Sequence, residues 1–247
     1  MSTRGGIMTL VRLAPEATTD VISDANLRTV IERGQIDLAL KGRALPKNEK
    51  LNVVASQREY VVSGASALLT DNDFLAIDLR GGGVQFYDGS RWLADPEFSP
   101  KTREWLDAKY QGWRTNSATS VPLYWYLDTK EDTGSDLVVG LVDKPSANGT
   151  DYLWVHYLSR GKLPTDDTHY LWTGSTTQLV YLEPYEILAV YYCLDWINRL
   201  ITKQTAEADK YRLMYEEGAA RMASRLPLAE HLIREGFEAV GYFSHFR

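Results

Sequence analysis

Residues 183–225 read EPYEILAVYYCLDWINRLITKQTAEADKYRLMYEEGAARMASR, and this stretch decides the fold that the sequence predicts. Positions 185–201 are apolar almost all round, which is typical of a helix buried between neighbours. After a break at 202–205, a second helix is predicted to run to Arg225, and Pro227 marks its end. Its predicted buried stripe consists of Tyr211, Met214, Tyr215, Gly218 and Met222. Two long helices joined by a short link predict an antiparallel helical hairpin.

One further helix is predicted near the beginning of the chain, over residues 24–40. Asp24 can cap its first turn, because a carboxylate accepts hydrogen bonds from the free amides there. Gly42 can end the helix, and Gly34 is tolerated inside it where a neighbouring helix passes close. The apolar positions that follow helical spacing are Leu27, Val30, Ile31 and Leu38.

From residue 51 onward the apolar pattern has a period of two, which indicates strands. The clearest signal is VQFYDGSRWL at 84–93, where Asp88-Gly89 predicts a tight type I′ turn between two strands. Ser99-Pro100 predicts the start of a short helix that ends near Tyr110, since a capping hydroxyl precedes a proline. Further strands are predicted at 51–54, 58–62, 123–128, 137–142 and 152–158.

These elements predict an α+β fold, in which a helical bundle is interrupted by an antiparallel β-rich domain. The bundle combines the N-terminal helix with the C-terminal helical hairpin. The predicted ranges are an N-terminal arm at 1–21, the bundle at 22–50 and 180–225, the β-rich domain at 51–179, and a C-terminal extension at 226–247.

Composition excludes several classes of protein. Of the 247 residues 44% are apolar and 24% charged, as in ordinary globular proteins, which excludes wholesale disorder, collagen and coiled-coil rods. Lys and Arg total 27 against 33 Asp and Glu, so the formal net charge is -6. A protein that grips DNA through its phosphates normally has a basic surface, and this chain does not on average.

The sequence also predicts a compartment. The single cysteine, Cys193, excludes an intramolecular disulfide. The N-terminal residues contain no apolar core of signal-peptide length. The longest wholly apolar run, at 187–194, is far shorter than the ~20 residues that span a bilayer. We therefore expect a soluble, intracellular-type protein that has no contact with a membrane.

The sequence contains no residue pattern typical of a catalytic or metal-binding site. The four histidines are scattered without metal-ligand spacing, and Cys193 lies in the most apolar helix. The carboxylates at 71–78 fail the EF-hand pattern. A glycosidase needs only two carboxylates, so a hydrolase stays open, but nothing selects a pair. We predict no enzymatic activity, no metal and no cofactor.

Aromatic residues make up 11% of the chain, and two predicted segments, 122–127 and the strand at 152–158, carry them on both faces of a sheet. Two interpretations stay open for them: a core covered on both sides, or a face that packs against another subunit. Aromatic side chains are enriched in the energetic centres of interfaces. The candidate interface residues are Tyr124, Trp125, Tyr126, Trp154, Tyr211 and Tyr215.

Several stretches, taken in order, resemble the head-to-tail adaptor (connector) proteins of tailed bacteriophages, of the short-tailed type. The central ones are REWLDAKYQGWR at 103–114 and PLYWY at 122–126. The flanking ones are the 24–40 helix, RALP at 43–46, LNVVASQ at 51–57, LEPYE at 182–186 and KYRLMYEEG at 210–218. The similarity spans roughly residues 22–225, and it is the order of the pieces, rather than any one motif, that carries it.

The resemblance implies a structural virion protein, made in the host cytoplasm and placed at the head–tail junction. Copies would form a ring, typically dodecameric, that links capsid to tail and continues the DNA channel. The implied partners are the portal protein, a tail tube or nozzle protein, further copies of the chain, and tail fibres. Genomic DNA would pass through without specific binding, which agrees with the acidic net charge.

The C-terminal extension is predicted to dock on a partner, the portal. A chain end rich in apolar side chains needs a surface that covers them. The candidate docking residues are Leu228, Leu232, Ile233, Phe237, Tyr242, Phe243 and Phe246. The alternative is that this extension folds back onto the bundle of its own chain.

A carbohydrate-binding or tail-fibre-type module is the alternative function. Such a module would also be rich in strands, Trp and Tyr, because sugars stack on aromatic faces. It would not need the long helical hairpin.

Overall fold

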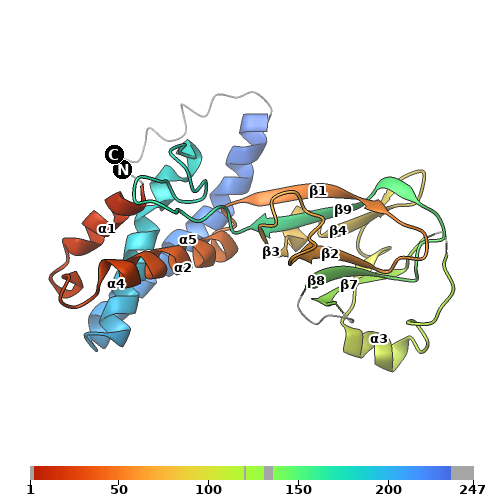
Figure 1. Cartoon of the computed structure of the whole chain (residues 1–247), viewed down its shortest axis with the longest axis horizontal. Helices are drawn as coiled ribbons and strands as arrows, with labels where there is room; N and C mark the ends of the chain where they lie inside the picture. The colour runs from red at the N-terminus through yellow and green to blue at the C-terminus, as the bar shows by residue number, and fades with distance from the viewer. Residues whose placement is uncertain (1–2, 120, 131–135, 235–247) are drawn as a thin grey trace. The chain divides into compact units, whose positions relative to one another are not determined.

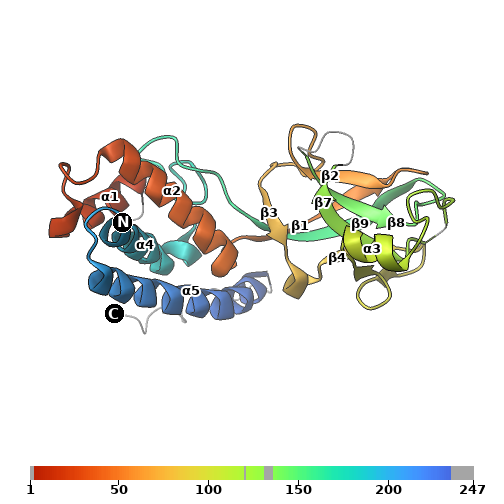
Figure 2. The same ribbon diagram turned by 90° about the horizontal axis from the view of Figure 1, so that it is seen from below.

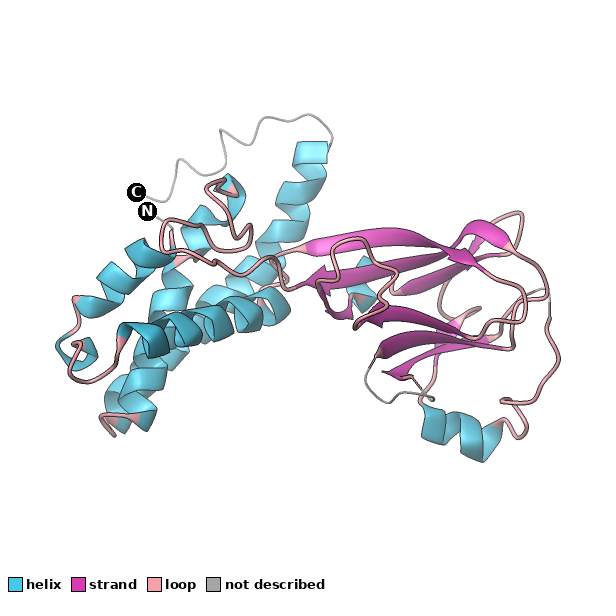
Figure 3. Cartoon of the chain, viewed as in Figure 1, coloured by secondary structure: helices cyan, strands magenta, loops and turns pink. Residues whose placement is uncertain are grey.

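The chain folds into two units, Met1–Leu45 with Arg160–Arg247, and Pro46–Ser159. The structure is a computed structural model that describes residues 3–119, 121–130 and 136–234, with side chains described up to Leu226. The first unit is helical and the second is built of strands (Figure 3), which confirms the predicted α+β class.

Both ends of the chain contribute to the helical unit (Figure 1). Its elements are α1 (Arg4–Arg12), η1 (Pro15–Ala17), α2 (Asp24–Lys41), η3 (Val180–Tyr185), α4 (Ile187–Leu200) and α5 (Thr205–Arg234). The apolar helix α4 packs against α1, α2 and α5, and Figure 2 shows α5 running along α4 and α2. The predicted helical hairpin therefore exists as α4 and α5, with α4 at the centre of the unit.

Close approaches fix how these helices pack. The backbone of α2 at Gly34 lies against the ring of Tyr192 on α4, and α5 at Gly218 lies against Leu188. A side chain at either glycine would overlap these neighbours. The expectation that a helix passes close to Gly34 is confirmed.

The helical unit departs from the prediction at four points. Ser23, not Asp24, caps α2, because its hydroxyl accepts from the amide of Asn26. The N-terminal arm contains α1, an ordered part of the unit whose buried side chains include Ile7 and Val11. Helix α5 continues past Pro227 to Arg234, and Met214 on α5 is exposed rather than part of the buried stripe.

The second unit is a sandwich of two sheets. Its elements are β1 (Pro46–Val53), β2 (Glu59–Ser63), β3 (Phe74–Ile77), η2 (Leu79–Gly81), β4 (Val84–Tyr87), β5 (Trp92–Leu93), β6 (Ser99–Pro100), α3 (Arg103–Lys109), β7 (Tyr124–Thr129), β8 (Leu137–Val142) and β9 (Gly149–Ser159). One sheet has the order β1-β9-β4-β5, with β3 also paired to β9, and the other has the order β2-β8-β7-β6. All pairs are antiparallel except β6 with β7.

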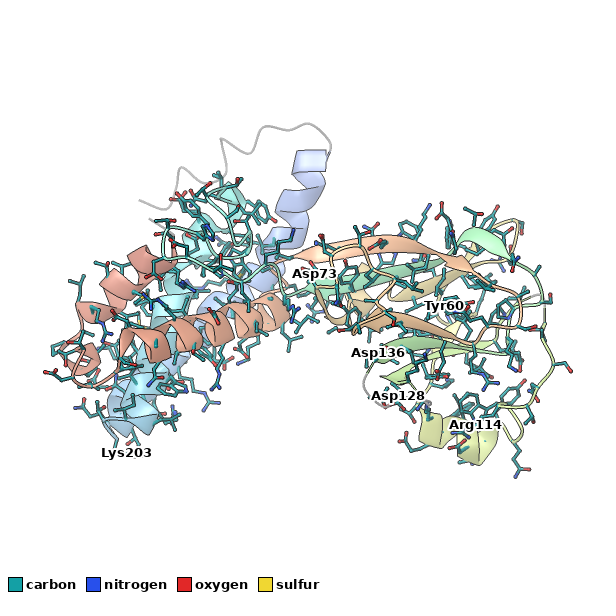
Figure 4. All side chains as sticks on the ribbon, viewed as in Figure 1. Tyr60, Asp73, Arg114, Asp128, Asp136 and Lys203 are labelled. Atoms are coloured by element: carbon teal, nitrogen blue, oxygen red, sulfur yellow. The ribbon has the colours of Figure 1, made fainter. Side chains whose placement is uncertain are left out.

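The core of the sandwich lies between the sheets, because alternate residues of each strand point inward. Leu153 and Val155 of β9 are fully buried there, and so is Tyr60 of β2, which Figure 4 labels. Helix α3 and the following loop cover the other face of the second sheet, where Leu106 and Trp113 are buried.

Local turn and cap chemistry in this unit differs from the prediction. The hairpin of β4 and β5 exists, but Tyr87 pairs with Trp92 across a longer loop, because the Asp88 carboxylate accepts from the amides of Ser90 and Arg91. Gly89 has a positive φ of 101° and Asp88 does not, so the turn is not type I′. Ser99-Pro100 forms the strand β6, and Thr102 caps α3 instead.

The boundaries of the units also differ from the predicted ranges. The chain crosses between the units at Leu45–Pro46 and at Ser159–Arg160. Residues 46–50 thus belong to β1, and residues 160–179 belong to the helical unit. Both crossings fall where β1 and β9 pair side by side, since Pro46 is the partner of Leu158.

Candidate functional site

The outward face of the sheet β1-β9-β4-β5 carries an unusual set of side chains. Register decides which residues share it: Leu153 pairs with Phe86 on the core side, so Trp154 and Gln85 point outward. Around Trp154, the strand residues on this outward face are Asn48, Lys50 and Asn52 of β1, Tyr152, Trp154 and His156 of β9, Gln85 and Tyr87 of β4, and Trp92 of β5. These side chains are aromatic, amide or basic, and the aliphatic pair Pro46 and Leu158 continues the same face beyond His156.

Five rings on this face form one continuous row. From Tyr152 through Tyr87, Trp92 and Trp154 to His156, successive ring centroids lie 5.2, 5.4, 5.2 and 4.6 Å apart. Every ring is half-buried, so each keeps part of its surface in contact with solvent. We call these five residues the aromatic row.

Lys50 and Asn48 complete the row on its β1 side. The Lys50 ammonium lies 5.2 Å from the ring centre of Trp92 and 5.1 Å from that of Trp154, over both faces. The indole N–H of Trp154 donates to the Asn48 side-chain oxygen at 3.2 Å. Two tryptophan faces therefore converge on one point above the sheet, where a flexible, exposed lysine now lies.

His156, at one end of the aromatic row, is half-buried. Burial lowers its pKa, and the nearby carboxylate of Asp78 opposes that shift. Since a histidine with a lowered pKa is neutral at physiological pH, Lys50 is the cation of this face.

The candidate interface aromatics separate into two groups. Trp125, Tyr126 and Tyr215 are at most 4% exposed, so these three pack inside their own chain. Trp125 lies between the two sheets, Tyr126 lies under α3, and the Tyr215 hydroxyl donates to Asp37 in the helical unit. For these three, burial inside their own chain favours the core interpretation.

Tyr124, Trp154 and Tyr211 keep partial exposure, and each has different neighbours within its own unit. Tyr124 packs edge-on against Trp105 of α3. Tyr211 stacks on Tyr191 in the helical unit, and Trp154 belongs to the aromatic row.

The candidate docking residues fall where the structure gives no side-chain detail. Leu228, Leu232 and Ile233 lie on the last turns of α5, and their side chains are not described. Phe237, Tyr242, Phe243 and Phe246 lie outside the described residues.

The surroundings of the buried Asp73 and Cys193 suit structural rather than catalytic roles. Asp73, labelled in Figure 4, is 4% exposed and accepts from Lys47 at 2.6 Å, from the hydroxyl of Tyr157 and from Ser159. Burial raises the pKa of the Cys193 thiol far above its usual range, so the reactive thiolate is disfavoured. Within the described residues, no three His, Cys, Asp or Glu side chains gather closely enough to hold a metal ion.

Sequence interpretation identifies Trp154 as a candidate but misses its partners Tyr87, Trp92, Tyr152 and His156. Alternation along each strand shows that Trp154 and His156 share a face. What it does not give is the pairing of β4 with β9, which joins residues about seventy positions apart.

In comparisons with known proteins, no family model matches this chain and no curated protein matches its sequence. No helix in the described part of the chain is long and apolar enough to cross a membrane.

Proposed function

We propose that this protein is a head-to-tail adaptor of a tailed bacteriophage. Copies of the chain form a homo-oligomeric ring, a dodecamer, beneath the portal, and the ring links the capsid to a tail tube or nozzle protein. Genomic DNA passes through the ring without specific binding. The role is structural, at the head–tail junction of the virion, and involves no catalysis.

The observation that carries this proposal is how the resembling stretches distribute between the two units. The stretches at 24–40, 182–186 and 210–218 fall in α2, η3 and α5, all in the helical unit. The stretches at 51–57, 103–114 and 122–126 fall in the inserted sheet unit. A helical bundle interrupted by a β domain is the arrangement that the resemblance implies.

Charge supports the same role. The formal net charge of -6 disfavours tight binding of phosphates, and a wall that lets DNA slide must not hold it. A closed ring requires two different patches on each copy, because its interfaces are heterologous.

Native mass spectrometry of the protein, alone and mixed with the portal protein encoded in the same genome, tests the proposal. We expect a stoichiometric ring complex that forms with the portal. A protein that stays monomeric and ignores the portal would contradict it.

The C-terminal docking hypothesis needs a truncation chosen from the structure. Leu226 is buried, so a stop after Arg225 removes a core side chain and cuts α5. A stop after Arg234 spares the whole helix and removes only residues 235–247. We expect this truncation to keep the circular dichroism spectrum of the full chain and to lose portal binding. Unchanged portal binding would reject the docking role of these residues and leave the ring proposal intact.

A further inference from the structure

We propose that the aromatic row on the sheet unit is a glycan-binding site that stacks pyranose rings of an oligosaccharide. This inference does not depend on the adaptor proposal, because it rests only on the outward face of one sheet.

The chemistry of the row fits a sugar ring. The faces of Trp and Tyr rings carry negative charge density, and one face of a pyranose presents weakly positive C–H groups that pack on it. Successive rings lie 5.2, 5.4, 5.2 and 4.6 Å apart along the row, so the platform is continuous from Tyr152 to His156. A continuous platform suits a chain of sugars rather than a single one.

Polar groups stand beside the rings where hydroxyl groups of a stacked sugar would project. Asn48, Asn52 and Gln85 provide carboxamides, which both donate and accept hydrogen bonds. The Asn48 oxygen already orients the indole of Trp154. Aromatic platforms flanked by carboxamides match the alternating apolar faces and polar edges of a saccharide.

Lys50 defines the space that the ligand enters. Its ammonium is about equally far from the ring centres of Trp92 and Trp154, at 5.2 and 5.1 Å, so both rings turn a face toward the same volume. Because the lysine is exposed and its stem is flexible, it can swing aside and donate to a hydroxyl or carboxylate of the sugar. The face therefore accepts neutral or acidic glycans.

Other classes of ligand fit this face less well. Single-stranded nucleic acid also stacks on aromatic side chains, but it requires a positively charged groove, and among the strand residues of this face Lys50 is the cation. Protein interfaces combine aromatics with Met and Arg around an apolar centre, whereas the rings of the aromatic row are flanked by Asn48, Lys50 and Gln85. Charge and composition together favour a glycan.

A glycan array that displays neutral and acidic hexopyranose oligosaccharides tests the proposal with the full chain. We expect binding to at least one glycan, and a loss of affinity of roughly tenfold or more in Trp154→Ala and in Trp92→Ala, as for central aromatic contacts in other interfaces. Trp105→Ala is the matched control, because Trp105 is 37% exposed on the same unit and lies under Lys101 in a similar cation–π contact. This control should bind the glycan as the natural chain does.

Lys50→Glu provides a second variant that changes only an exposed side chain and should fold normally. It should weaken binding of acidic oligosaccharides more than that of neutral ones. Circular dichroism and thermal unfolding check that each variant is folded.

Three outcomes would overturn the proposal: no binding to any glycan on the array, equal losses in the Trp154 and Trp105 variants, or loss of self-association in Trp154→Ala. The last would assign the face to a contact between copies. Because Trp154→Ala is expected to leave portal binding unchanged, failure here is separable from failure of the adaptor proposal.

Discussion

Gly140 in the centre of β8 should be unable to accept even one methyl group. It pairs with Tyr126 on β7, and a Cβ at this position would overlap the outer carbons of the Tyr126 ring. Three neighbouring groups restrict the movement of this ring. Trp113 packs edge-on against it at 5.4 Å, the Arg103 guanidinium lies 4.9 Å from its centre, and its hydroxyl donates to Glu59 at 3.1 Å.

The expected cost of Gly140→Ala follows from these contacts. Overpacking a well-filled core costs about 1–3 kcal/mol. Displacing the ring also breaks the hydrogen bond to a charged Glu59, which contributes about 1.5–3 kcal/mol. Alanine offsets about 0.4–1 kcal/mol of this by reducing the freedom of the unfolded chain. We therefore expect the free energy of unfolding of the sheet unit to fall by about 2–5 kcal/mol.

Urea unfolding followed by circular dichroism and tryptophan fluorescence measures this loss. A double-mutant cycle isolates its cause, because Tyr126→Leu removes the ring atoms that a Cβ at Gly140 would meet. In the Tyr126→Leu background, Gly140→Ala should cost little or stabilise. The reasoning fails if Gly140→Ala costs under about 1 kcal/mol, or if its cost is the same in both backgrounds.

Two further predictions concern the helical unit. The Arg28 and Arg4 hydrogen bonds lower the pKa of Asp167 from 3.8 to about 2, so this carboxylate stabilises the fold above about pH 4 and the contribution is lost as pH falls toward 2. Since Asp167 is 37% exposed, Asp167→Asn should lower the free energy of unfolding by about 1 kcal/mol at pH 7 and reduce its dependence on pH in the acid range. Urea unfolding midpoints between pH 2 and 6 that match those of the natural chain would contradict this. Cys193 is fully buried with a raised thiol pKa, so iodoacetamide at pH 8 should label it only once urea unfolds the helical unit. Rapid labelling without urea would show that α4 is not packed as described.

The helical hairpin was predictable because its signal is local. An apolar run such as that of α4 needs burial wherever it lies, and Gly34 indicated a close neighbour. Helix α1 also has a local signal, a Thr3 cap followed by Ile7, Met8 and Val11 on one face, which the prediction missed, but its place in the unit depends on distant contacts. Its first residue, Arg4, is held by Asp167 and by the carbonyl of Pro164, about 160 positions away in the chain. Contacts at that separation leave no trace in a short window of sequence.

In the sheet unit, the cap of α3 was predicted wrongly because two nearby residues could each provide it. Ser99-Pro100 and Thr102 both carry a hydroxyl that can cap a helix. The choice depended on pairing, because Ser99 and Pro100 form a parallel ladder with Tyr124 and Trp125. That pairing takes them out of the helix and leaves Thr102 to accept from the amide of Trp105.

The candidate aromatics show the same limit at the level of faces. Alternation separates Trp125 from Tyr126, yet it does not tell that both faces of β7 are covered, one by the opposite sheet and one by α3. Which faces of a strand are covered depends on how the sheets and α3 assemble. The two-sided core and the exposed face were therefore indistinguishable in sequence.

The aromatic row follows from strand register, which the core sets. A slip of one residue in β9 would move Trp154 into the sandwich and expose Leu153 and Val155, at a cost that the core would not tolerate. Burial of these two residues thus holds Trp154 beside Trp92 without needing any favourable contact on the outer face. Outer rings can then be replaced while the register persists, so substitutions in the row should change binding before they change folding.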